Sequence, residues 1–191
     1  MRDFFMIIFA AVFVNNYVLS KTLGICPFLG VSKKFNQAAG MGIAVVFVMV
    51  LATAVTWPIQ TYVLAPLEIE YLQTIAFILV IAALVQFVEI VMKRHLPSLH
   101  GSLGVYLPLI TTNCAVLDSA LSNISEGYSF LHSIGNAFGG GVGFLLAMVL
   151  FAGVRSKIDQ NENIPASFKG LPITLVAAAI VSLSFMAFML K

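Results

Sequence analysis

The chain has 191 residues, of which 60% are hydrophobic and 9% are charged, whereas about 25% of the residues of an ordinary soluble domain are charged. Its mean hydropathy is +1.02 and its formal net charge is only +2 at pH 7. No water-soluble core could bury so much apolar surface, so the composition excludes a soluble globular protein and indicates an integral membrane protein.

Six apolar runs follow one another along the chain, and most approach the roughly 20 residues that a bilayer-spanning helix needs. Helices are expected because lipid offers no partner to unpaired backbone groups. We therefore predict an all-α integral membrane protein with six transmembrane helices in a single membrane domain, residues 1–191. The runs are Phe4–Leu19, Met41–Trp57, Leu72–Met92, Leu103–Leu121, Ile134–Val154 and Leu171–Leu190.

The first run is interpreted as a retained helix and not as a signal peptide. Arg2 is offset at once by Asp3, and no small-residue cleavage site precedes a soluble body.

Two of the runs, the first and the fourth, are interrupted by residues that disfavour a continuous apolar helix. The first interrupted segment reads VNNYVLSKTLGICPFLGVSKK, and the second reads GVYLPLITTNCAVLDSAL. A glycine cluster and a further apolar run follow each segment, with Gly40 and Gly42 in the first half and Gly139–Gly143 in the second. The Gly139–Gly143 cluster predicts close helix packing, because small residues let two backbones approach.

The matching order of features predicts an internal duplication, with repeat one at about 1–95 and repeat two at about 96–191. Three spans are an odd number, so the second repeat enters the membrane from the opposite side. The predicted fold is two inverted-topology three-helix repeats with interrupted first and fourth helices. Repeats of this kind place a functional site near the midplane, at the interrupted segments. Here the rule indicates Cys26 and Cys114.

The basic residues predict the orientation, because short loops rich in Lys and Arg stay cytoplasmic. They lie in the connectors after the first, third and fifth runs, whereas the other connectors carry none. Both termini are therefore expected on the outer side of the membrane. The residues concerned are Lys33, Lys34, Lys93, Arg94, Arg155, Lys157 and Lys169.

Cys26 and Cys114 are the two cysteines of the chain, one in each interrupted segment, and four interpretations compete. They could be small buried hydrophobic residues or form a disulfide, although a bond at membrane depth lies away from the oxidising compartment. A zinc site normally has four thiolate or imidazole ligands. The histidines lie in or near connectors, away from either cysteine, which disfavours zinc. An iron–sulfur cluster also needs four ligands, so it requires a partner that supplies two more.

Polar residues within membrane spans are functional candidates by default. Asn15, Asn16 and Asn113 could form interhelical hydrogen bonds, satisfy the backbone at the helix breaks or bond to the sulfurs of a cluster. Thr112 is a further candidate near such a cluster. Lys21 could reach an interface or pair with an acid of a partner subunit, and Asp118 is a candidate for an ion path. Glu89 precedes Lys93 by four residues, which predicts a helix-surface ion pair.

The segments LGICPFLGVSKK (Leu23–Lys34) and LPLITTNCAVL (Leu107–Leu117) resemble the paired cysteine segments of the RnfA/NqrE family. The resemblance continues through VNN, FILVIAALVQFVEIV and GVGFLLAMVLFAGVR and covers essentially the whole chain. Asn15, Asn16 and the Cys26–Pro27 pair are more similar to the RnfA branch than to the NqrE branch, which belongs to a sodium-pumping quinone reductase.

This resemblance implies a membrane subunit of the Rnf electron-transport complex, an ion-translocating ferredoxin:NAD oxidoreductase of the bacterial or archaeal inner membrane. It implies that Cys26 and Cys114 bind a [2Fe–2S] cluster jointly with two cysteines of the paralogous RnfE subunit, and that the other partners include RnfD and RnfG. Flavins are then expected only in other subunits, and no nucleic acid is expected as a partner. The coupling ion, Na⁺ or H⁺, stays open.

Two other functions compete with this one. A small secondary transporter would use the inverted repeats to frame a substrate site, but it leaves the paired cysteines unexplained. A structural scaffold for redox subunits would need neither cysteine.

Overall fold

The described part of the computed structural model comprises residues 2–32, 35–67, 70–95, 107–160, 165 and 170–186, and within it every regular element is a helix. This agrees with the predicted all-helical membrane protein. The helices are α1 (Arg2–Phe9), the π-helical η1 (Ala10–Val14), α2 (Ile25–Val31), α3 (Phe35–Ile59), η2 (Gln60–Leu64), α4 (Ala65–Leu67), η3 (Glu70–Leu72), α5 (Gln73–His95), α7 (Leu107–Thr111), α8 (Cys114–Ser125), α9 (Phe130–Asp159) and α10 (Leu171–Met186).

Three helices of the described ranges are long and apolar enough to cross a membrane: Phe35–Leu64, Gln73–Val91 and Phe130–Ile158. Two shorter apolar helices, Phe4–Val14 and Leu171–Met186, stand at the two ends of the described chain. The second, third and fifth predicted runs therefore correspond to the three long helices. The second and fifth helices extend beyond the predicted bounds at both ends, whereas Gln73–Val91 lies within the predicted run Leu72–Met92.

The two interrupted runs leave helical geometry, as their sequences predict. In the first run the helix ends at Val14 and not at Leu19, and a ten-residue loop follows before α2 begins at Ile25. The predicted bound was wrong because the Asn16 side chain bonds to the backbone of this loop, which stops the helix. In the fourth run only Thr112 and Asn113 separate α7 from α8, and residues 103–106 lie outside the described residues.

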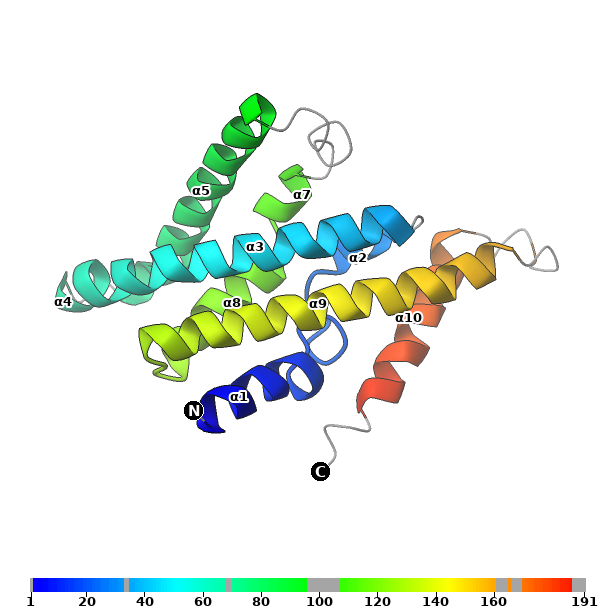
Figure 1. Ribbon diagram of the computed structural model, residues 1–191, viewed down its shortest axis with the longest axis horizontal. Helices are drawn as coiled ribbons and strands as arrows, with labels where there is room; N and C mark the ends of the chain where they lie inside the picture. The colour runs from blue at the N-terminus through cyan, green and yellow to red at the C-terminus, as the bar shows by residue number, and fades with distance from the viewer. Residues whose placement is uncertain are drawn as a thin grey trace.

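The centre of the molecule is formed by α3 and α9, which lie side by side and run in opposite directions (Figure 1). A Cβ atom on Gly42 would lie 3.1 Å from the Cα atom of Leu145, and one on Gly141 would lie 2.9 Å from the Cα atom of Val46. The contacts thus advance along α3 while they recede along α9. Glycine permits this approach of two backbones, so close packing at the Gly139–Gly143 cluster is confirmed.

Helix α9 also packs on α1 and η1, through a second row of glycines. Gly135 faces Phe4, Gly139 faces the Ile8 carbonyl and Gly143 faces the Val12 carbonyl. Large buried side chains complete the core between α3 and α9, namely Met41, Val45, Met49, Phe144, Met148 and Phe151.

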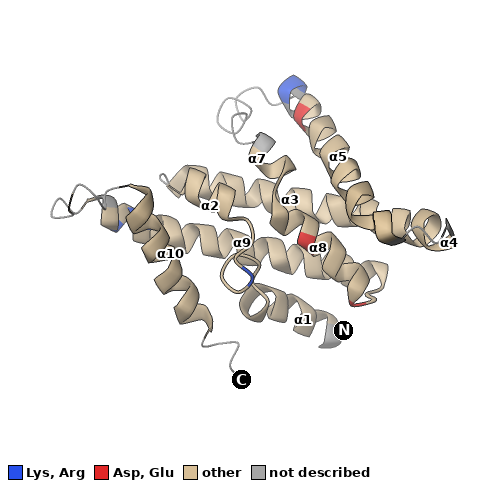
Figure 2. Cartoon of the chain, turned by 180° about the vertical axis from the view of Figure 1, so that it is seen from behind, with Lys and Arg blue, Asp and Glu red and all other residues tan. Residues whose placement is uncertain are grey.

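Charged residues lie mainly at helix ends. Figure 2 shows Lys and Arg at the C-terminal end of α5 and near the end of α9. One cation and one acid lie in the interior of the view, in the loop before α2 and on α8. Glu89 and Lys93 form no ion pair in the described structure, where the Lys21–Asp118 bridge is found instead. The helix-surface pair predicted for Glu89 and Lys93 was therefore wrong.

Candidate cysteine site between the two interrupted segments

The structure brings the two cysteine segments into contact, although they lie far apart in the sequence. The backbone N–H of Gly24 donates a hydrogen bond to the Sγ atom of Cys114 over 2.9 Å. Gly24 precedes Cys26 by two residues, so this bond ties the Cys114 thiol directly to the start of the Cys26 helix. The two interrupted segments are therefore in contact within a single chain.

Both cysteines lie in the first turn of a helix. Cys26 is the second residue of α2, whose N-cap is Gly24, and Cys114 is the first residue of α8, whose N-cap is Asn113. The N-terminal end of a helix such as α8 carries the positive end of its dipole and unpaired N–H groups, both of which favour an anionic ligand such as a thiolate. The Cys114 side chain thus lies at the positive end of the α8 dipole.

The thiols are free and exposed on the surface of the isolated chain. They form no disulfide, and they are not buried hydrophobic residues, so both of those interpretations were wrong. No group of three or more His, Cys, Asp and Glu side chains within the described ranges could hold a metal ion. Two exposed thiols fit the chemistry of a metal centre only if ligands from another chain complete the set.

Gly24 is the residue that permits the contact between the segments. Its φ angle is +76°, in the left-handed region that favours glycine. A Cβ atom here would lie 2.7 Å from the Phe144 ring and 3.2 Å from Asn113 Oδ1. The backbone therefore reaches Cys114 because this position carries no side chain.

Asn113 has an unusual hydrogen-bonding state. Its Oδ1 atom accepts a bond from the N–H of Ala115 over 3.1 Å, which caps α8. This bond fixes which end of the amide is oxygen. The Nδ2 atom is buried and has no partner in the described structure. A buried donor without a partner costs about 1–3 kcal/mol and marks a place where an absent acceptor would fit.

The loop before Cys26 is fixed by Asn16, which is fully buried. Its Nδ2 atom donates to the carbonyl oxygens of Val12 and Gly143, and its Oδ1 atom accepts from the N–H groups of Val18 and Leu19. The interhelical and helix-break hydrogen bonds that the sequence predicted as one alternative for Asn16 are therefore present. Its bond to Gly143 depends on α9, which is distant in sequence.

Arg155 fixes the other end of α2. Its Nη1 atom donates to the Leu29 carbonyl over 2.7 Å and to the Ser32 hydroxyl over 2.8 Å. Phe28 stacks on Phe151, with ring centroids 4.2 Å apart. In the sequence, Arg155 was used only to predict the orientation of the chain, and this role was missed. A basic residue at the end of an apolar run does not indicate by itself which backbone or side chain it will bind.

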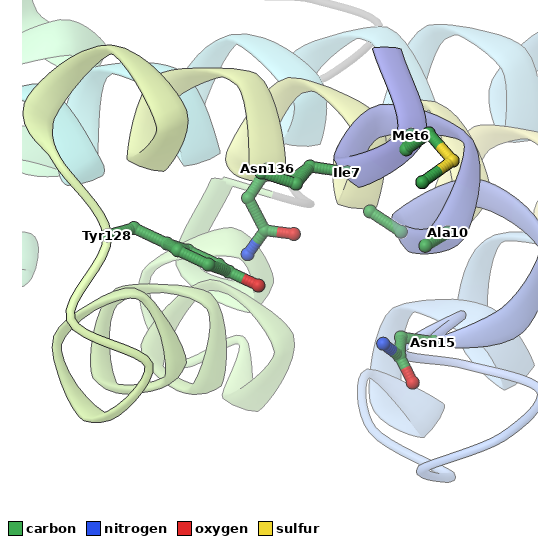
Figure 3. A pocket seen from close by; sticks show the side chains of 7 residues that line it. Met6, Ile7, Ala10, Asn15, Tyr128 and Asn136 are labelled. Atoms are coloured by element: carbon green, nitrogen blue, oxygen red, sulfur yellow. The ribbon is translucent and has the colours of Figure 1, made fainter. Parts of the chain in front are cut away.

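Two further predicted site residues lie in different places. Thr112 is exposed in the break between α7 and α8, next to Asn113. Asn15 lines a separate pocket of about 310 Å³, and neither cysteine is among the residues that line it. Figure 3 shows the Asn15 side chain at the end of η1, across the opening from Tyr128 and Asn136.

Comparisons with known proteins agree with this architecture. A family described as "Rnf-Nqr subunit, membrane protein" matches residues 4–190. The chain is 55% identical over 188 residues to the A subunit of the ion-translocating oxidoreductase complex of Syntrophotalea carbinolica, and the match covers 98% of this chain and 97% of that protein. It is also 55% identical to the A subunit of the Na⁺-translocating ferredoxin:NAD⁺ oxidoreductase complex of Acetobacterium woodii, over 95% of this chain and 94% of that protein. The corresponding protein of an Azoarcus species is 50% identical over 98% of this chain and 97% of its own length.

Proposed function

The chain belongs to the Rnf-Nqr family of membrane subunits, and from this premise we propose that it is one subunit of a membrane-bound translocase that couples electron transfer between ferredoxin and NAD to the movement of Na⁺ or H⁺. The names of its relatives, including one called Na⁺-translocating, support this assignment. The chain contributes a part of the enzyme and not a complete active site.

The specific role proposed for this chain is to hold half of a [2Fe–2S] cluster. Cys26 and Cys114 supply two thiolates, and the paralogous RnfE subunit supplies the other two. The observation that carries the proposal is the bond from Gly24 N–H to Cys114 Sγ, because it gathers two exposed, free thiols from separate segments. When bound, such a cluster carries one electron at a time, near the middle of roughly 30 Å of hydrocarbon.

The surrounding residues of this chain stabilise the thiolates. Gly24 N–H donates to Cys114 Sγ, and the first turn of α8 directs its positive end toward the same sulfur. The buried Nδ2 donor of Asn113, which has no partner within the described residues, would find its acceptor in a sulfur of the bound group, which tunes the reduction potential. Thr112 borders the same site, whereas Asn15 belongs to its own pocket.

The topology that accompanies this role is an inverted repeat with boundaries near 95 and 96. Each half contains an interrupted helix, then a long helix, then a third helix, and the two long helices α3 and α9 run antiparallel. An antiparallel crossing of equivalent helices is what a two-fold axis in the membrane plane produces. The contacts of Gly42 with Leu145 and of Gly141 with Val46 set the start of α3 on the same side as the end of α9, and basic residues adjoin both helix ends in the sequence. This supports our proposal that both termini lie on the outer side of the inner membrane.

The alternative functions lack comparable support. A secondary transporter needs an enclosed midplane site, whereas the thiols here face outward. A scaffold requires neither free thiols nor a bond between the segments. The partners proposed for the complex are RnfE at the cysteine face, together with RnfD and RnfG, and the flavins reside in those other subunits.

The test is metal analysis of the purified complex and of its subunits. The pair of this chain with its cysteine-bearing partner should contain about two irons and two acid-labile sulfides and give an electron paramagnetic resonance signal after reduction, whereas this chain alone should not. Cys26→Ala and Cys114→Ala should each abolish the signal. Ser125→Ala, an exposed position at the end of α8, is the control and should retain it. Full iron content in both cysteine variants would reject the proposal.

A further inference from the structure

We infer that Lys21 and Asp118 are positioning residues for the two thiols, an inference that rests on the function proposed above. Their ion pair fastens the loop before Cys26 to the helix that begins with Cys114. It thereby fixes the spacing of the cysteines and places a charge pair beside them.

The ion pair joins the two halves of the chain. The Nζ atom of Lys21 lies 2.9 Å from Asp118 Oδ2 and also donates to the Ser122 hydroxyl over 3.3 Å. The ammonium group lies 5.3 Å from the centroid of the Tyr17 ring, within the range of a cation–π contact. Three separate side chains thus determine where the Lys21 side chain ends.

Each member of the pair lies close in sequence to one of the cysteines. Asp118 follows Cys114 by four residues in α8, so the two side chains project from the same face of that helix, one turn apart. Lys21 precedes Gly24 by three residues, and Gly24 N–H bonds to Cys114. The ion pair and the N–H···S bond are therefore two ties between the same two segments.

The partial burial of the Lys21–Asp118 pair indicates that it does more than hold the two segments together. The Lys21 and Asp118 side chains are only 39% and 30% exposed on the surface of this chain, so both charges are partly withdrawn from solvent, which costs free energy. Apolar side chains would join two segments at lower cost. Unlike an apolar contact, this ion pair places an ammonium group and a carboxylate on the two segments that carry the cysteines, where they would act electrostatically on the thiolates of a bound cluster.

Opposite shifts of the reduction potential follow from this arrangement. Asp118→Asn leaves the ammonium group uncompensated, which favours the reduced and more negative state and makes the midpoint potential more positive. Lys21→Gln leaves the carboxylate uncompensated, which makes the potential more negative. We expect each change to alter the equilibrium for one-electron reduction about tenfold, equivalent to about 59 mV.

The experiment is a redox titration of the purified complex, followed by electron paramagnetic resonance, with iron content measured on the same samples. Glu89→Gln and Lys93→Gln are the matched controls, because both residues lie near the end of α5 and form no ion pair in the described structure. They should leave the potential unchanged. Lys21→Arg keeps the positive charge and should therefore have the midpoint potential of the native complex. The swap K21D/D118K should keep the iron content of the native complex.

Shifts of the same sign in the two single variants, or shifts no larger than those of the controls, would overturn the inference. If a single variant loses its iron, the iron content of K21D/D118K is the deciding measurement. Iron retained in this double variant supports the positioning role of the ion pair, and iron lost from it rejects that role. A native complex without a cluster at these cysteines would instead reject the proposed function itself, so the two failures are distinguishable.

Discussion

The helix breaks in the two cysteine segments are held in place by different kinds of hydrogen bond. The Cys26 segment has a ten-residue break and is held by bonds that reach across the chain, from Asn16 to Gly143 and from Arg155 to Leu29. The Cys114 segment has a two-residue break and is held locally, by the bond from Ala115 N–H to the Asn113 side chain. The break in the first segment is therefore held by α9, whereas the break in the second is capped by its own residues and gains the Gly24 and Lys21 contacts only from the first segment.

This difference teaches which half of the site depends on assembly of the whole fold. A local cap forms whenever its helix forms, but bonds to distant partners exist only after the helices have packed. We therefore expect substitutions in the Cys26 segment to cost more stability than substitutions in the Cys114 segment.

The largest effect is expected at Asn16. Replacement by Ala leaves two N–H groups and two carbonyl groups buried without the bonds that Asn16 supplies, which should lower the free energy of unfolding by about 4 kcal/mol. Equilibrium unfolding in mixed micelles of increasing SDS content measures it. Asn36→Ala, an exposed asparagine in the first turn of α3, is the matched control and should change little. A cost at Asn16 as small as that at Asn36 would break the comparison.

An intermediate effect is expected at Gly24, where the two segments meet. Gly24→Ala forces a side chain into a left-handed conformation and against Phe144, which should cost about 3 kcal/mol. It should also reduce cross-linking of Cys26 to Cys114 by a short bismaleimide. Gly127→Ala separates the two causes, because Gly127 has φ +64° with open space around it, and it should cost only about 1 kcal/mol. Equal costs at both positions would mean that the contact between the segments adds nothing.

The smallest effect is expected at Asn113. Asn113→Ala removes the cap of α8 and should cost about 1 kcal/mol, while Asn113→Ser keeps an acceptor and should recover most of it. Serine lacks the amide donor, so the serine variant should still make the midpoint potential of the complex more negative. Stability measured in micelles and potential measured by redox titration sharpen the comparison. A cost at Asn113 equal to that at Asn16 would contradict the local character of this segment.

Much of the site could be predicted from the sequence, because Cys26, Cys114 and Asn113 lie in short segments with a recognisable order of Gly, Pro and polar residues. The partner of Lys21 could not be predicted. The sequence predicted that Lys21 reaches an interface or pairs with an acid of a partner subunit, whereas its partner is Asp118 of the same chain, because no local rule links residues 97 positions apart. The buried role of Arg155 and the separate pocket of Asn15 were also beyond a one-dimensional pattern.

The sequence by itself determined that this protein is a helical membrane protein with two interrupted segments and one cysteine in each, because hydropathy and helix-breaking residues act over a few turns of chain. Only the tertiary structure decided that Gly24 touches Cys114, that Lys21 pairs with Asp118 and that Asn16 bonds to α9. These contacts depend on how the antiparallel α3 and α9 pack through their glycines, and such packing brings distant residues together without leaving a local signal in the chain.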